Sequence, residues 1–183
     1  MSIAASNRLE HTKWQRETIM SLSREALEIA HAVNAELARL YAGREITSLM
    51  DLHSSVSSIR AHGRQLALNG QMIEMLDAET VALACRELQA SVFADGLIGA
   101  ATQLGAVEYD DHPVHRGRRT RPPSEKRVEM WSKTYDAGLE KIGDSMSKLI
   151  LASKIELRKI DGARHSDGTS MRGRLWDCIR ARA

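Results

Sequence analysis

The side chains best suited to chemistry in this sequence are the basic ones between His115 and Arg127. The segment HRGRRTRPPSEKR contains six basic residues and one acidic residue. An arginine donates two parallel hydrogen bonds to one phosphate group, and the two prolines keep the neighbouring chain extended. A second basic segment begins at Arg158, with seven basic and three acidic residues to the end of the chain. We therefore predict a nucleic-acid-binding surface formed by Arg116, Arg118, Arg119, Arg121, Lys126, Arg127, Arg172 and Arg174.

The pattern around these arginines favours binding to the shape and charge of nucleic acid rather than to base edges. No helix-turn-helix or zinc signature is visible, and few aromatic residues lie between the arginines to stack on bases. Contact with six phosphates would make binding fall steeply with salt. Two alternatives stay open: a segment that only keeps the chain soluble, and one that docks on an acidic protein surface, including the acidic first half of this chain.

A second candidate site lies on the first predicted helix, where His31 follows Arg24 by seven residues. This R-x6-H spacing puts both side chains on one helical face and resembles the R-x4–6-H element of HEPN-type ribonucleases, which are all-α and usually dimeric. The resemblance implies that Arg24 orients the scissile phosphate and that His31 acts in general acid–base catalysis. The family commonly has Asn, Asp or His after the arginine, whereas Glu25 here would place an acid beside the phosphate.

Metal ligands are present only as incomplete sets. Glu28 and His31 have the E-x-x-H spacing of di-iron bundles, but no second pair exists. The cluster of Asp110, Asp111, His112 and His115 lies in a polar linker, and Cys85 and Cys178 form no C-x-x-C pair. No nucleophile elbow, P-loop or Rossmann motif is found. We predict no metal and no cofactor, and favour a protein that is not an enzyme.

Composition points to helices and to an uneven charge distribution. The 183 residues include 4% aromatics and only 3 prolines, with two cysteines that suit a reducing, cytoplasmic compartment. We expect no signal peptide, no membrane-spanning run of about 20 apolar residues and no membrane partner. The net charge of +2 divides into −6 for residues 1–111 and +8 for residues 112–183. This division indicates an acidic partner for the second half, or contact between the halves.

Apolar residues recur at helical spacing through most of the chain. They predict helices over residues 7–41, 45–68, 78–104 and 124–160, with a single helical turn at 72–76. Gly96 and Gly99 lie inside the third helix and indicate either a close helix crossing or a break near residue 96. We expect Asp161-Gly162 to end the last helix. The fold class predicted is an all-α, elongated antiparallel helical bundle with two long and two medium helices and a basic C-terminal extension.

These elements divide the chain into a bundle at residues 1–161, with a basic linker at 106–123, and a basic, partly flexible tail at 162–183 that ends in a short amphipathic helix. The helices are longer than a compact globule needs, so we expect a homo-oligomer, most simply a dimer. Helices 7–41 and 124–160 would supply its buried seam. The predicted interface residues are Trp131, Tyr135, Leu139, Ile142, Met146, Leu175, Trp176 and Ile179.

Together these patterns favour a non-enzymatic helical assembly or adaptor protein that binds an acidic partner, with nucleic acid as the first choice. A protein of a mobile element or phage would fit this form. The alternatives are the metal-independent, HEPN-like ribonuclease that uses Arg24 and His31, and an inhibitor or complex subunit that binds only protein.

Overall fold

The computed structural model describes residues 3–42, 49–94, 96–111 and 123–180, and this part of the chain is helical with no strand. The helices are α1 (Ile3–Ala42), α2 (Leu49–Glu74), α3 (Glu79–Val92), α4 (Leu97–Asp111) and α5 (Glu125–Arg180). The predicted all-α bundle is confirmed. Two of its helices are long, with 40 residues in α1 and 56 in α5.

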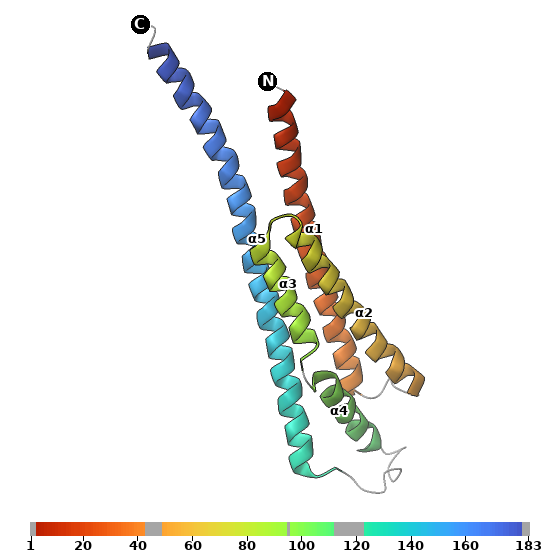
Figure 1. The fold of residues 1–183 in the computed structure, drawn as a ribbon. Coiled ribbons are helices and arrows are strands. Elements are labelled where there is room, and N and C mark those ends of the chain that lie inside the picture. Colours follow the sequence, from red (N-terminus) through yellow and green to blue (C-terminus); the bar gives the residue numbers. More distant parts are fainter. Residues whose placement is uncertain (1–2, 43–48, 95, 112–122, 181–183) are drawn as a thin grey trace.

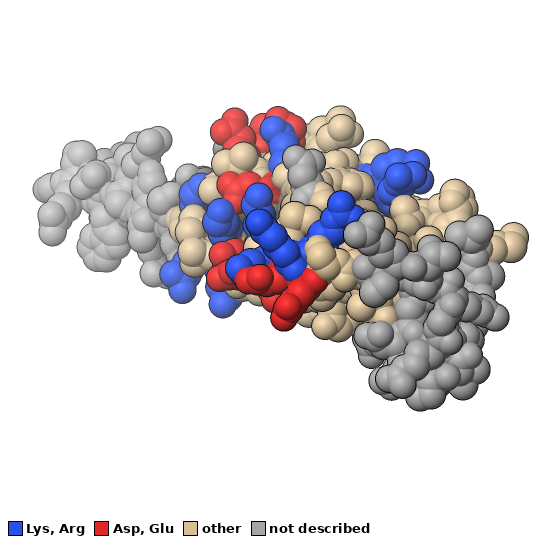
Figure 2. Space-filling model, turned by 90° about the horizontal axis from the view of Figure 1, so that it is seen from below, with Lys and Arg blue, Asp and Glu red and all other residues tan. Residues whose placement is uncertain are grey.

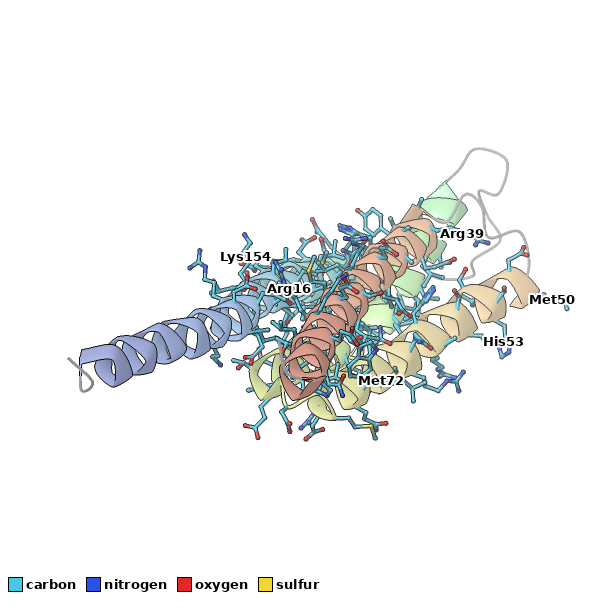
Figure 3. The ribbon with its side chains drawn as sticks, turned by 90° about the horizontal axis from the view of Figure 1, so that it is seen from above. Arg16, Arg39, Met50, His53, Met72 and Lys154 are labelled. Carbon is cyan, nitrogen blue, oxygen red and sulfur yellow. The ribbon has the colours of Figure 1, made fainter. Side chains whose placement is uncertain are left out.

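The two long helices run in opposite directions and form the frame of the bundle (Figure 1). α3 packs against α1, α2 and α5, and α4 packs against α1 and α5. The N-terminal end of α1 and the C-terminal end of α5 extend past the short helices at the same end of the molecule (Figure 1). The start of α2 lies at the outer edge of the bundle, where Met50 is 82% exposed (Figure 3).

The predicted apolar stripe of α1 forms the centre of the core. It recurs every three or four residues, so its members share one face of the helix. These side chains are buried: Ile19, Leu22, Ala26, Ile29, Ala30, Val33, Leu37 and Leu40. α3 adds Val81, Cys85, Leu88 and Val92, and α5 adds Tyr135, Ile142, Leu149 and Ala152.

The third predicted helix is divided into α3 and α4, so the break near residue 96 is the correct one of the two alternatives. Phe93 and Ala94 lie between the two helices, and Gly96 has a φ of +82°. A side chain is disfavoured in this left-handed conformation, which explains a glycine there. The break lets α4 leave the direction of α3 and pack between α1 and α5.

Two predicted helix ends are wrong. α2 continues through Asn69-Gly70 to Glu74, because both residues are buried in its packed face. A β-carbon on Gly70 would lie 3.4 Å from the Cβ of Cys85, an ordinary contact distance, so this part of α2 packs against α3. α5 likewise continues past Asp161-Gly162, and Asp161 pairs with Arg16 of α1 at 3.6 Å.

Backbone contact between α1 and α4 requires another glycine. A β-carbon on Gly105 would lie 1.9 Å from the carbonyl oxygen of Leu40. Since real β-carbons do not come so close to an oxygen, only glycine permits this crossing. Gly105 therefore holds α4 against the C-terminal part of α1.

Buried hydroxyl groups connect α5 to its neighbours. Ser145 of α5 lies 2.7 Å from Ser91 of α3 between side-chain oxygens, and both residues are buried. Ser153 donates to Ser23 of α1 at 3.0 Å. The Ser91–Ser145 pair is buried and the Ser23–Ser153 pair is partly buried, and an unpaired hydroxyl at either place would be costly.

The stretch Glu79–Val107 is long and apolar enough to cross a membrane by length and composition, with a mean hydropathy of 1.3. The expectation that no part of the chain is apolar enough to span a membrane does not hold by this criterion. In the structure it is divided between α3 and α4, and its buried side chains include Val81, Leu88 and Leu97, which belong to the core of the bundle.

Candidate nucleic-acid interface

The start of α5 carries the two predicted basic residues whose side chains the structure describes. The carbonyl oxygen of Ser124 accepts hydrogen bonds from the backbone N–H of Arg127 at 2.8 Å and of Val128 at 3.2 Å, which fixes the first turn. Lys126 and Arg127 are exposed on this turn. Neither pairs with a carboxylate in the described part of the chain, so both charges face solvent.

A surface hollow of about 750 Å³ extends along the first turns of α5. Its described lining is Ser124, Lys126, Arg127, Glu129, Met130, Lys133, Thr134 and Ala137. Lys133 pairs with Glu129 at 2.7 Å, so Lys126 and Arg127 are the lining cations that have no ion pair with a described residue. The described lining therefore combines exposed cations with the apolar side chains of Met130 and Ala137.

Several cations farther along α5 are paired, in contrast to this pair. Lys148 donates to Glu87 of α3 at 2.8 Å, and this hydrogen bond, with the negative charge of Glu87, raises the pKa of Lys148. Lys159 pairs with Glu156 at 2.9 Å. Figure 2 shows Lys and Arg side chains interspersed with Asp and Glu side chains on the face seen from below. The described part of this face is therefore mixed in charge.

The remaining cations without an ion pair among the described residues are spread over α1, α2 and α5. All are exposed: Arg24, Arg60, Arg64, Lys141, Lys154 and Arg158. Those on α2 lie far along the chain from the basic linker, so they provide matched controls for experiments on the start of α5.

Six of the eight predicted nucleic-acid-binding residues fall beyond the described side chains. Four lie outside the described residues: Arg116, Arg118, Arg119 and Arg121. The backbone of Arg172 and Arg174 belongs to α5, as does that of Leu175, Trp176 and Ile179, but these side chains are outside the described part. The four linker arginines come just before α5 in the chain, so Lys126 and Arg127 continue the same basic segment.

The other predicted interface residues face the interior of the single chain. Tyr135 and Ile142 are buried, and Trp131, Leu139 and Met146 are partly buried against the core. Tyr135 stacks on Tyr41 of α1, with ring centroids 4.8 Å apart and planes 16° apart. Burial raises the pKa of Tyr135, helped by the nearby Tyr41 and the charge of Asp136. This face of α5 is occupied by its own bundle.

The predicted ribonuclease pair, Arg24 and His31, lies on the exposed side of α1. Glu25 accepts a hydrogen bond from Gln65 of α2 at 3.1 Å, so its carboxylate is directed toward α2. Among the described residues, no partner orients Arg24 or His31. The described part of the chain also holds no group of three or more metal-ligating side chains. Asp110 and Asp111 end α4, and His112 and His115 lie outside the described residues.

Contacts between helices bring together residues that lie far apart in the sequence. Arg16 of α1 pairs with Asp161, and Lys154 lies on the neighbouring helix α5 (Figure 3). A second hollow of about 560 Å³ is lined there by Lys13, Arg16, Glu17 and Met20. The partners are more than 100 positions apart in the chain, so no local spacing could have indicated this arrangement.

Comparison with protein-family models, with curated proteins and with solved structures finds no match to this chain.

Proposed function

We propose that this protein is a non-enzymatic helical-bundle protein that binds nucleic acid through the basic segment leading into α5. The observation that supports this proposal is the exposure of Lys126 and Arg127, with no carboxylate partner among the described residues. Cations that are already paired within a protein gain little from a phosphate, whereas free ones gain a charge-assisted hydrogen bond.

The chemistry of the segment favours the phosphate backbone as its target. Six basic residues between positions 115 and 127 provide closely spaced hydrogen-bond donors, and only Glu125 opposes them in charge. Side chains of this kind contact phosphate and sugar and carry little base information. We expect similar affinity for unrelated sequences of the same length and form.

A gel-shift titration with a labelled oligonucleotide tests this proposal. The double variant Lys126→Ala with Arg127→Ala should bind more weakly than the unchanged protein at low salt, by about tenfold, because each lost phosphate contact removes its counterion release. Replacement of the four linker arginines should weaken binding further.

The matched control is Arg60→Ala with Arg64→Ala on α2, which removes two exposed, unpaired cations outside the basic segment. This variant should bind almost as the unchanged protein does. Equal loss in both double variants would mean that total charge, and not the basic segment, determines binding. No shift with DNA or RNA at low salt would refute the proposal and leave the protein-only alternative.

The same titration distinguishes the ribonuclease alternative. Labelled RNA should stay intact in the presence of the protein and a chelator. Because His31 is exposed, His31→Ala should not disturb the bundle. Metal-independent cleavage that this variant abolishes would therefore overturn our proposal in favour of the ribonuclease.

A further inference from the structure

α5 has an outer face that the bundle does not use. Its buried face carries Tyr135, Gly138, Ile142, Ser145, Leu149 and Ala152. On the opposite side lies a row of exposed residues, which we call the outer row: Asp136, Glu140, Gly143, Ser147, Leu151, Lys154 and Arg158.

The outer row forms one straight line along the helix. Its members are spaced by three or four residues, so at 100° per residue each points within about 40° of the direction of Ser147. This is the narrow stripe with which one helix of a coiled coil faces another. The row therefore has the geometry of a helix–helix contact.

Charge along the outer row is antisymmetric about Ser147. Asp136 and Glu140 lie 11 and 7 residues before this serine, and Arg158 and Lys154 lie 11 and 7 residues after it. A second α5 laid antiparallel across Ser147 therefore brings each carboxylate opposite a cation. Glu140 faces Lys154 of the other copy, and Asp136 faces Arg158.

The centre of the outer row suits a close crossing. A β-carbon on Gly143 would meet nothing within 4 Å, and Ser147 is small, with its hydroxyl already donating to the carbonyl oxygen of Gly143 at 3.0 Å. Leu151 is 60% exposed. In the antiparallel arrangement Leu151 lies opposite Gly143, four residues to either side of Ser147, so a leucine enters the space that a glycine leaves.

The charges of the outer row are also free to pair. None of its four charged side chains has an ion pair within the described part of the chain, although charged neighbours on the same helix do. Lys133 pairs with Glu129, and Lys148 pairs with Glu87.

From these observations we propose that two copies of this chain associate through the outer row, with antiparallel α5 helices crossing at Ser147 about a twofold axis. A twofold contact must be self-complementary, and the reversed charges with a Gly143–Leu151 match at the centre meet that condition. The contact involves one helix from each copy and exposed ion pairs, so the dimer is reversible and weakens with salt. This inference does not depend on nucleic-acid binding.

Charge reversal tests the pairing, with sedimentation of the full-length protein as the readout. One variant combines Asp136→Lys with Glu140→Lys, and the other combines Lys154→Glu with Arg158→Glu. Each alone should dissociate at least about tenfold more readily than the unchanged protein, because all four ion pairs of the dimer become repulsive. An equimolar mixture of the two should restore the dimer, because every pair is then opposite in charge.

The replaced side chains are exposed, so both variants should keep the circular dichroism of the unchanged protein. Arg60→Glu with Arg64→Glu on α2 is the matched control, which should not change association. The proposal is overturned if the unchanged protein sediments only as a monomer at low salt. It is equally overturned if the reversed variants still dimerise alone, or if their mixture stays monomeric.

Cross-linking gives a second readout at the twofold axis. In a Cys178→Ser background, Ser147→Cys should form a disulfide-linked dimer on mild oxidation, since the residue lies next to its own copy there. Lys141→Cys, on the same helix but outside the outer row, should cross-link far less. Equal cross-linking of the two would contradict the twofold axis at Ser147.

Discussion

At the scale of single residues, the packing of Gly105 against the backbone of Leu40 makes a sharp prediction. Gly105→Ala should lower the free energy of unfolding by about 1–3 kcal/mol, because the new methyl group collides with the carbonyl oxygen of Leu40 and pushes α4 from α1. Gly99→Ala on the same helix meets nothing within 4 Å and should raise it by about 0.5–1 kcal/mol. Urea unfolding followed by circular dichroism measures the effect of each variant. Similar effects of the two variants would contradict the close crossing of α1 and α4 at Gly105.

The thiol of Cys85 makes a second residue-scale prediction. Burial raises its pKa from 9.0 to about 11, so at pH 8 it is almost entirely the unreactive thiol. In a Cys178→Ser background, a thiol reagent should label the folded protein much more slowly than the protein in urea. The neutral thiol favours the folded state, so its contribution to stability is full below pH 9 and is lost as pH rises toward about 11. Equally fast labelling with and without urea would mean that Cys85 is accessible.

At the scale of helices, removing one or the other of the two buried hydroxyls between α3 and α5 should lower stability by unequal amounts. Ser91 also donates to the carbonyl oxygen of Glu87 at 2.8 Å, so Ser145 is the member with one described partner. Ser91→Ala leaves the hydroxyl of Ser145 buried and unpaired, and should lower the free energy of unfolding by about 1–2 kcal/mol. Ser145→Ala should cost less, since Ser91 keeps its bond to Glu87. A double-mutant cycle in urea checks this order, and purely additive effects would show that the hydroxyls do not interact.

The sequence predicted which segments are helical because apolar periodicity is a local signal. The buried stripe from Ile19 to Leu40 follows directly from its spacing. Helix ends were harder to predict, since Asn69-Gly70 has the composition of a turn and yet continues α2. The reason is the packing of Gly70 against Cys85 of α3, a contact that local composition does not contain.

The candidate site was predictable to a similar degree. The exposure of Lys126 and Arg127 follows from their place on the first turn of a helix whose apolar face begins at Val128. Which of the other cations are neutralised by a carboxylate on another helix was not predictable. The partners Lys148 and Glu87 are 61 positions apart, so only the packing of α3 on α5 brings them together.

At the scale of the whole molecule, the two halves neutralise each other in part. Lys148 of the basic half pairs with Glu87 of the acidic half. In a second pair the basic half supplies the carboxylate, Asp161, and the acidic half supplies the cation, Arg16. Lys126 and Arg127 at the start of α5 form no ion pair with a described residue. The excess positive charge of residues 112–183 therefore leaves free donors beside the basic linker.

Phosphate binding by the basic segment is tested most directly by the dependence of nucleic-acid affinity on salt, measured by fluorescence anisotropy with a labelled duplex. If six basic residues contact phosphates, the logarithm of the binding constant should fall with the logarithm of salt concentration with a slope of about −5. Lys126→Ala with Arg127→Ala should reduce the magnitude of that slope by about 2, and Arg60→Ala with Arg64→Ala should leave it unchanged. A slope that is near zero, or that the α2 variant changes as much as the α5 variant does, would contradict the account.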